Sequence, residues 1–159
     1  MIEKKLVIIT GASRGIGKTF LDEFKKQDNV IPIGINRTGS AGIKLDLNDM
    51  NATYKFIENL SLKNISRIVY MHAIGIDKFE PHGKAAIDFD NDGIDDEIYA
   101  TNYLTFTHLA EPLIEKVKVI SIPLTIANIG SISDIYEVPY WQSFSKAKNK
   151  VRKFCKSIN

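Results

Sequence analysis

Three glycines near the start of the chain have a spacing that suits the binding of a phosphate group. The apolar, β-branched run 5–10 leads directly into Gly11, Gly15 and Gly17, and a helix-like sequence follows. Strand, tight turn and helix in this order place the unpaired N–H groups and the positive dipole end of the helix at the turn, where a pyrophosphate can bind. Gly11 can adopt the strained turn, Gly15 lets a phosphate approach the backbone, and Gly17 lets the helix pack close to the sheet. The segment therefore predicts a dinucleotide-binding turn.

Two arginines lie where a domain of this kind distinguishes between dinucleotides. Asn36-Arg37 follows the second strand-like run, where NAD-selective domains often carry a carboxylate for the ribose hydroxyls. No carboxylate is present here, and the Arg37 guanidinium can pair with a 2′-phosphate. Arg14, inside the glycine turn, can reach the same phosphate. We predict that NADP(H) binds better than NAD(H); the alternative is that both are ordinary exposed arginines.

The segment Thr-Gly-Ala-Ser-Arg-Gly-Ile-Gly at 10–17 resembles the cofactor motif of the short-chain dehydrogenase/reductase family. Further motifs of that family follow in the same order along the whole chain. The resemblance implies a Rossmann-like fold, a nicotinamide cofactor and a small-molecule carbonyl or alcohol substrate. It also implies a set of cofactor-binding residues: Gly11, Ser13, Arg14, Gly15, Ile16, Gly17, Arg37, Asp46, Leu47, Ala73, Gly75 and Lys148.

Two of these cofactor positions rest on weaker matches. The family places an Asp such as Asp46 next to the adenine, but an Asp here can equally cap the helix that is expected to follow. The segment His-Ala-Ile-Gly at 72–75 stands in the place of the family's Asn-Asn-Ala-Gly, with Ala73 replacing an Asn and Gly75 retained. We assign His72 no chemistry, because a lone His after a strand is more often structural than catalytic.

The resemblance also implies three polar residues of a catalytic site. Asn102 matches the family's helical Asn, which helps hold the water and the lysine of a proton relay. Ser131 matches the serine that polarises the substrate carbonyl, with Ser133 as a second candidate. Lys148 matches the lysine that binds the nicotinamide ribose and lowers the pKa of a catalytic tyrosine.

The tyrosine of the family's Tyr-x-x-x-Lys motif is missing. Hydride transfer to a carbonyl needs a proton donor, and the i to i+4 spacing places Tyr and Lys on one helix face. In the register ending at Lys148 the tyrosine position holds Phe144, and in the alternative register ending at Lys146 it holds Gln142. Phenylalanine keeps the ring but has no proton to donate, and losing a positioned general acid slows a reaction roughly a hundred- to ten-thousandfold.

The family continues with another strand, a Pro-Gly loop and helices that close over the substrate, and the sequence ends before them. Two functions follow as hypotheses: an NADP(H)-dependent oxidoreductase with a weakened proton relay, or an inactive or truncated dinucleotide-binding module that lacks the substrate-binding part of the family. The family pairs its subunits through the helices expected at 93–117 and 143–158, which carry apolar stripes here. We therefore expect a homodimer.

The elements that must position these residues alternate between strand and helix. Alternation of this kind predicts parallel βαβ units, and hence one Rossmann-like domain over 1–159, a doubly wound parallel sheet in three α/β/α layers. The strand-like runs are 5–10, 30–35, 42–45, 67–71 and 124–129, and the helical segments are 15–27, 49–61, 93–117 and 143–158. The segment 74–92 is expected to be a loop.

Composition excludes several other classes of protein. The 159 residues include 21 basic and 19 acidic side chains, so no overall charge points to nucleic acid or a membrane surface. The lone Cys155 suits a reducing compartment, and with no leader or spanning run we expect a cytoplasmic protein. The basic face of the last helix is expected to be solvated. Asp88–Gly93 has half the spacing of a calcium loop but lacks its bidentate Glu, so we expect no bound metal.

Overall fold

The computed structural model describes residues 3–76, 79–80 and 84–158. The chain divides into two compact units, residues 1–74 with 108–129 and residues 75–107 with 130–159. The first unit contains the whole sheet, and the second contains the helical segments that follow β4 and β5.

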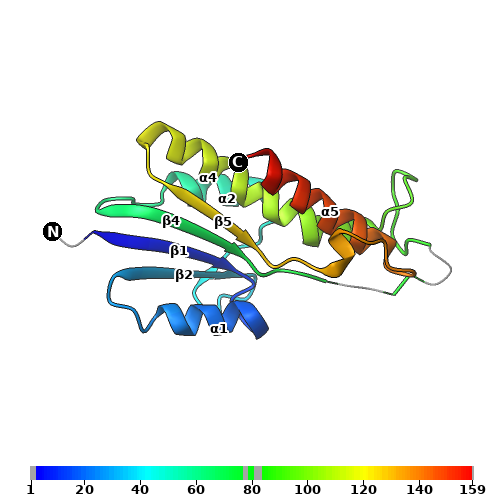
Figure 1. Ribbon diagram of the computed structural model, residues 1–159, viewed down its shortest axis with the longest axis horizontal. Coiled ribbons are helices and arrows are strands. Elements are labelled where there is room, and N and C mark those ends of the chain that lie inside the picture. The colour runs from blue at the N-terminus through cyan, green and yellow to red at the C-terminus, as the bar shows by residue number, and fades with distance from the viewer. Residues whose placement is uncertain (1–2, 77–78, 81–83, 159) are drawn as a thin grey trace. The chain divides into compact units, whose positions relative to one another are not determined.

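The sheet of the first unit has five parallel strands in the order β3-β2-β1-β4-β5, as Figure 1 shows. The strands are β1 (Lys4–Thr10), β2 (Val30–Asn36), β3 (Ile43–Lys44), β4 (Ile65–His72) and β5 (Leu124–Asn128). This order confirms the predicted Rossmann-like fold. The direction of the chain across the sheet reverses between β1 and β4, and the carboxyl ends of strands at such a switch point are where α/β proteins bind ligands.

Helices cover both faces of this sheet. The helices are α1 (Gly15–Phe24), α2 (Met50–Glu58) and α4 (Thr105–Ile120), the last of which begins in the second unit. Right-handed crossovers place α1 on one face and α2 and α4 on the other, which gives the three expected layers (Figure 1).

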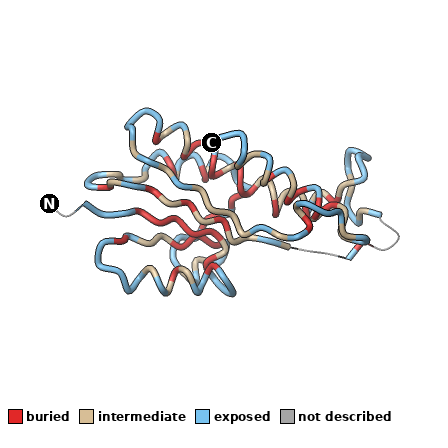
Figure 2. Tube along the Cα trace, viewed as in Figure 1, coloured by how far each residue is buried: buried red, intermediate tan, exposed pale blue. Residues whose placement is uncertain are grey.

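The core follows from the alternation of side chains along β1. Val7 and Ile9 pack with Leu21 of α1 on one face. Leu6 and Ile8 alternate with them and therefore face the other layer, and all five side chains are buried. Figure 2 shows the buried stretch running along β1. A central parallel strand that is buried on both faces explains why the segment reads as an unbroken apolar run.

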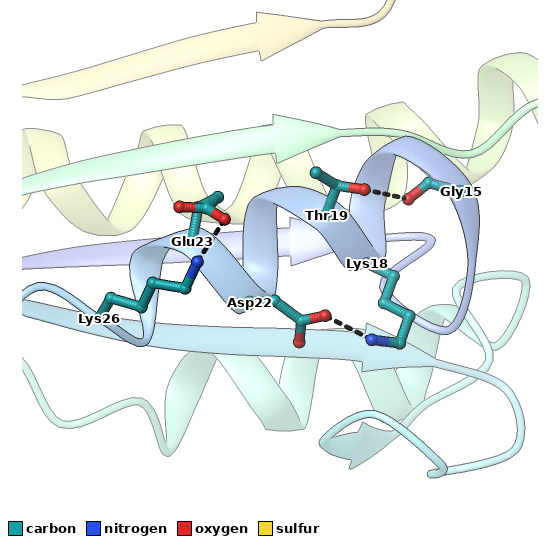
Figure 3. A network of polar contacts seen from close by, with 6 residues as sticks. All are labelled: Gly15, Lys18, Thr19, Asp22, Glu23 and Lys26. Atoms are coloured by element: carbon teal, nitrogen blue, oxygen red, sulfur yellow. Dashed lines mark hydrogen bonds and ion pairs between the residues drawn. The ribbon is translucent and has the colours of Figure 1, made fainter.

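The outer face of α1 is held by short-range polar contacts (Figure 3). The Lys18 ammonium bonds to Asp22 one turn on, and this hydrogen bond lowers the pKa of the Asp22 carboxyl below its ordinary range. Lys26 bonds to Glu23 at 2.6 Å. Both pairs are exposed, so each contributes little to stability.

A lysine on α4 closes the end of α2. The Lys116 ammonium donates to the carbonyl oxygens of Ile57, Glu58 and Leu60 at 2.7, 2.9 and 3.0 Å. The last carbonyls of a helix have no partner within the helix, and a positive charge there also complements the helix dipole. Lys116 thus fastens the two helices of this layer to each other.

The second unit contains α3 (Asp96–Tyr99), the π-helical turn η2 (Ala100–Leu104), the 3₁₀ turn η3 (Ile132–Asp134) and α5 (Gln142–Ser157). The helical segment expected at 93–117 is present as the contiguous elements α3, η2 and α4, but a π turn lies within it. Asp95 caps α3 by accepting from the Ile98 N–H at 3.0 Å, and a π turn then separates α3 from α4. The Asn102 amide donates to the Ile98 carbonyl at 2.8 Å and so competes for the acceptor that an α-helix needs, which explains the wider turn.

Helix α5 is amphipathic as the sequence predicts. Ala147 and Val151 are fully buried, and the Phe154 ring meets Phe106 edge-on with centroids 5.4 Å apart. Four lysines of the opposite face are exposed, namely Lys146, Lys150, Lys153 and Lys156. These four fit the expected solvated basic face, but Lys148 of the same basic run is buried and Arg152 is half-buried, so the expectation is wrong for Lys148.

We predict that Lys116→Met destabilises the chain by about 1–3 kcal/mol, because it removes a donor shared by three carbonyls at the end of α2, of which the Ile57 carbonyl keeps the Leu60 N–H. Urea unfolding measures the change. Lys118→Met is the matched control: Lys118 bonds only to the exposed Glu115 among the described residues, at 2.9 Å, so its loss is expected to cost less than about 1 kcal/mol. Equal effects of the two substitutions would contradict the role of Lys116.

Candidate functional site

The three glycines of the turn meet three different requirements. Gly11 has φ +69°, and a Cβ there would lie 2.5 Å from the carbonyl oxygen of Ala73. A Cβ at Gly17 would lie 2.4 Å from the carbonyl oxygen of Gly11, so the helix rests directly on the turn. Gly15 has φ +54°, and no atom lies within 4 Å of the position that its Cβ would take. The turn is thus tightly packed beneath Gly11 and Gly17 and open at Gly15.

The first turn of α1 presents free donors at this opening. Arg14 precedes the helix in an extended conformation and makes no side-chain cap, and the first turn carries no acidic residue. Ser13, Arg14 and Ile16 are all exposed. A helix N-terminus whose N–H groups lack a capping side chain suits an anion such as a phosphate.

A buried amide donor lies beside Arg37 at the end of β2. The Asn36 side chain is 7% exposed, and its Oδ1 accepts from the N–H and the hydroxyl of Thr38 at 3.1 and 2.8 Å. Its Nδ2 has no hydrogen-bond partner among the described residues. Arg37 itself is exposed. The end of β2 thus carries a buried donor without a described partner, and the exposed Arg37 guanidinium that follows it in the chain can pair with an anion such as a ribose phosphate.

Buried polar contacts tie β1 to β4 at the switch point. The hydroxyl of Thr10 and that of Tyr70 lie 3.0 and 2.9 Å from Nδ1 of His72, and all three side chains are fully buried. Thr10 and His72 are the last residues of their strands and face each other in the sheet register. This placement agrees with the structural role expected of His72.

Asp46 does not cap α2. The helix cap is Asp49, whose carboxylate accepts from the Ala52 N–H at 2.9 Å, whereas Asp46 accepts from the Asn48 N–H at 3.0 Å within the preceding turn. The capping alternative for Asp46 is therefore wrong. Leu47 is buried, and its carbonyl accepts from Nδ1 of His108 at 2.7 Å.

In the second unit, Asn102 holds the chain that follows β4. Its Oδ1 accepts from the Ile76 N–H at 3.2 Å, and its Nδ2 donates to the Ile76 carbonyl at 2.7 Å. The side chain is fully buried in the π turn. Asn102 therefore links the π turn to the backbone of Ile76, the residue after Gly75.

Lys148 meets Asn102 and Phe144 around Gly75. A Cβ on Gly75 would lie 3.5 Å from Oδ1 of Asn102 and 3.6 Å from Nζ of Lys148. Nζ also lies 5.6 Å from the centre of the Phe144 ring. A small group above Gly75 can thus contact an amide oxygen and an amine at once.

Burial changes the acidity of this lysine. Lys148 is 4% exposed, and its desolvation lowers the pKa of the ammonium to about 8 against an opposing attraction from Asp134. Lys146, the lysine of the alternative register, is exposed. The geometry favours the register that ends at Lys148, with Phe144 at the tyrosine position.

The two candidate serines contact each other. Ser131 caps η3, accepts from the Ser133 N–H at 3.2 Å and donates to the Ser133 hydroxyl at 3.2 Å. The next residue, Asp134, joins η3 to α5, because its carbonyl accepts from the Asn149 amide at 2.8 Å. Ser133 is buried, so Ser131 is the more accessible hydroxyl.

Within residues 3–76, 79–80 and 84–158, one group of acidic side chains has the spacing of a cation site. The carboxylates of Asp88, Asp90 and Asp92 lie within 4.8 Å of one another. Each already accepts a backbone N–H of its own loop.

No protein-family model matches the chain, and no curated protein is similar to it in sequence. Solved structures do match. One is 4-hydroxyisoleucine dehydrogenase complexed with NADH, at a TM-score of 0.79 and 19% identity over 98% of this chain and 68% of that one. A second is ligand-free aldohexose dehydrogenase of Thermoplasma acidophilum, at 0.77 and 21% identity over 99% of this chain and 61% of that one. A third is a tyrosine-to-phenylalanine variant of ElxO with NADPH bound, at 0.75 and 21% identity over 98% of this chain and 66% of that one.

Further neighbours are described as short-chain dehydrogenases. The chain spans about two thirds of the length of the three proteins named above. At these identities the likeness concerns the fold, and the fold is the one that the glycine turn predicts. In the residues searched, no helix is both long and apolar enough to cross a membrane.

The lowered pKa of Lys148 predicts how stability changes with pH. The unfolded lysine titrates near 10.5 and the folded one near 8, so between these values the unfolded chain binds more protons and stability rises with pH. The shift corresponds to about 3 kcal/mol, a cost that is present in full below pH 8. From pH 7 to pH 10.5 we expect the free energy of unfolding of the unmodified chain to increase by about 3 kcal/mol relative to that of Lys148→Met.

Urea unfolding of both proteins at several pH values tests this expectation. Lys146→Met, at the exposed position two residues earlier, is the matched control. The difference in unfolding free energy between Lys148→Met and the unmodified chain is the quantity to follow. If it stays constant with pH, the Lys148 ammonium remains hydrated in the folded protein.

Proposed function

We propose that this chain is an NADP(H)-binding oxidoreductase of the short-chain dehydrogenase/reductase type, acting on a carbonyl/alcohol pair with a weakened proton relay. The observation that carries the proposal is the glycine turn at the switch point of the sheet. It is packed against the end of β4 at Gly11 and open at Gly15. Open backbone donors at a helix N-terminus are the feature that a pyrophosphate needs.

The residues of the first unit fit the proposed cofactor. The N–H groups at the start of α1 would bind the pyrophosphate. Arg37, Arg14 and the orphaned amide of Asn36 would bind the adenosine ribose and its 2′-phosphate. In this proposal Asp46 and Leu47 lie next to the adenine, and Ala73 and Gly75 contact the cofactor through their backbones.

The chemistry proposed for the second unit follows from its polar group. When bound, the cofactor supplies a hydride to the carbonyl carbon. Ser131 would turn its one hydroxyl proton from Ser133 to the substrate carbonyl oxygen, and Lys148 would bind the nicotinamide ribose. Asn102 would keep the chain beside Gly75 in place through its two bonds to Ile76. Phe144 offers no proton, so the developing alkoxide must take one from a slower source.

The second candidate function is a dinucleotide-binding module without catalysis. Phe144 is the observation that favours it, because it packs beside Lys148 as a tyrosine ring would but carries no hydroxyl. The ElxO variant with a phenylalanine in place of a tyrosine holds NADPH, which supports cofactor binding as separable from turnover. The two functions differ only in the rate of the chemical step.

We further propose that the chain acts as a single dinucleotide-binding domain and pairs with a second copy. Helix α4 ends in apolar residues that remain uncovered, with Val119 85% exposed. A groove of about 830 Å³ lies beside them, with Tyr54, Pro112, Val119 and Ile120 among its lining residues. Exposed apolar surface of this kind favours association.

We predict that NADPH binds more tightly than NADH and that Arg37→Ala removes the preference, because the guanidinium pairs with the 2′-phosphate. Fluorescence titration at fixed salt measures the affinity for each of the two cofactors. Arg67→Ala, a substitution of an exposed arginine on β4, is the control for net charge. Equal affinities in the unmodified chain, or a preference that survives Arg37→Ala, would overturn the assignment of the 2′-phosphate site.

We also predict that carbonyl reduction by the unmodified chain is very slow and that Phe144→Tyr raises its rate by roughly a hundredfold or more, because a hydroxyl then lies one helical turn from Lys148. NADPH affinity is expected to stay the same. Gln142→Tyr is the matched control, since it restores the motif only in the register that ends at Lys146. A rate gain from Gln142→Tyr alone would select that register, and fast turnover that survives Lys148→Ala and Ser131→Ala would show that the active site lies elsewhere.

A further inference from the structure

Strand β5 is one edge of the sheet in the part of the chain that the structure describes (Figure 1). Its inner side pairs with β4 in an unbroken register from Leu124 to Asn128. No residue of β5 is fully buried, whereas β1 at the centre of the sheet is buried from Leu6 to Thr10. The outer side of β5 is therefore a place where the main chain of this sheet can meet another strand.

Hydrogen bonds at the two ends of β5 show which of its residues face outward. The Pro123 carbonyl accepts from the Ile68 N–H at 2.9 Å, and the Ile129 N–H donates to the His72 carbonyl at 3.0 Å, so residues 123 and 129 both face β4. The main-chain N–H and C=O groups of successive residues alternate between the two sides of a strand. The outward groups are therefore those of Leu124, Ile126 and Asn128. Among the described residues none of these groups has a main-chain partner.

The two edges of the sheet differ in how they are protected from further pairing. The opposite edge is β3, which is two residues long and ends in the exposed Lys44. Short strands and lysines are common devices that keep an edge from adding strands. Strand β5 has five residues and contains no charge, glycine or proline. Pro123 precedes it, but the ring nitrogen lies on the same side as the carbonyl that accepts from β4, so the ring leaves the outer side open.

The outward groups of β5 are complementary to those of a second β5. If two copies of the strand pair antiparallel about a two-fold axis at Ile126, this residue exchanges both hydrogen bonds with its counterpart, and Leu124 does so with Asn128 of the second copy. Every outward N–H then meets a C=O. The intervening side chains, Thr125 and Ala127, are uncharged, so no like charges oppose each other across the axis.

We propose that two copies of this chain associate through β5, as an antiparallel β5–β5 pair that joins their sheets edge to edge. The strand follows directly on the uncovered end of α4, because three residues separate the 43% exposed Ile120 from Leu124. The contact is isologous, so association stops at the dimer. The inference rests on the pairing with a second copy proposed above and names its interface, and it is independent of the proposed cofactor and chemistry.

Amide hydrogen exchange measured by NMR at a low and a high protein concentration tests the proposal. The outward N–H groups of Leu124, Ile126 and Asn128 become bonded in the pair, so their exchange should slow about tenfold or more at the higher concentration. The N–H groups of Thr125 and Ala127 face β4 and should exchange slowly at both concentrations. This alternation is specific to the edge, because association through helices leaves the β5 amides as they are.

A substitution at the centre of the pair tests the same contact. Ile126→Pro removes the outward N–H and puts a ring in its place, so self-association in sedimentation velocity should weaken about tenfold or more. Ile126→Ala is the matched control, because it shortens the same half-buried side chain and keeps the N–H, and it should still associate. If Ile126→Pro does not fold, the exchange pattern of the unmodified chain decides.

The outcomes separate this inference from the other proposals. Self-association without alternating protection in β5 would overturn the inference and leave the proposed pairing to another surface. A chain that stays monomeric at the higher concentration would overturn both. Protection that is equal at the two concentrations would overturn the inference by showing that the edge is covered within one chain. Binding of NADPH is measured separately, so its failure counts against the proposed oxidoreductase and not against the β5 interface.

Discussion

The close approach of the glycine turn to the end of β4 is the constraint on which the rest of the first unit depends. A side chain at Gly11 would meet the Ala73 carbonyl, and one at Gly17 would meet the carbonyl of Gly11. Only residues without a Cβ let β1, the turn and α1 stack at this distance. The stacking then fixes where the first N–H groups of α1 lie, and the buried Thr10–His72 contact fixes the neighbouring strand beside them. The placement of the α1 N–H groups, which suits an anion, is therefore a consequence of how β1, the turn and α1 pack.

Local sequence was sufficient to predict the sheet and most of its helices. Parallel strands buried on both faces read as apolar runs, and the buried part of β1 is of this kind. What local sequence could not predict depends on contacts between distant residues. The π turn within the helical segment expected at 93–117 involves Asn102, whose amide also bonds to Ile76, 26 residues earlier. Tyr140, in the turn before α5, has φ +66°, and its carbonyl accepts from the N–H of Glu80, in a segment that sequence reads only as a loop.

The candidate site also has features that local sequence predicts and features that depend on contacts between distant residues. Motif spacing predicts Lys148, Ser131 and Asn102 as site residues, but the acidity of Lys148 depends on what covers its side chain, and spacing carries no information about that. The same holds for the orphaned amide of Asn36, because the donor becomes visible only once Thr38 is seen to occupy the other end of the side chain. An Asn before an Arg has no signature of its own in a single sequence. Positive φ at a tyrosine also leaves no local signal beyond the proline before it.

Two costs in the second unit bear on whether the chain retains a ligand-binding role. Keeping a lysine at 4% exposure lowers its pKa and destabilises the folded chain at neutral pH, and a tyrosine in the left-handed region costs roughly 1–2 kcal/mol more. Domains of this size are stable by only about 5–15 kcal/mol, so such costs are a large fraction of the total. Single substitutions at either position would remove these costs. Phe144 is different, because a phenylalanine in place of a tyrosine loses the hydroxyl and keeps the ring. Under the proposed function, the cost at Lys148 belongs to a carbonyl site whose fast proton donor is absent.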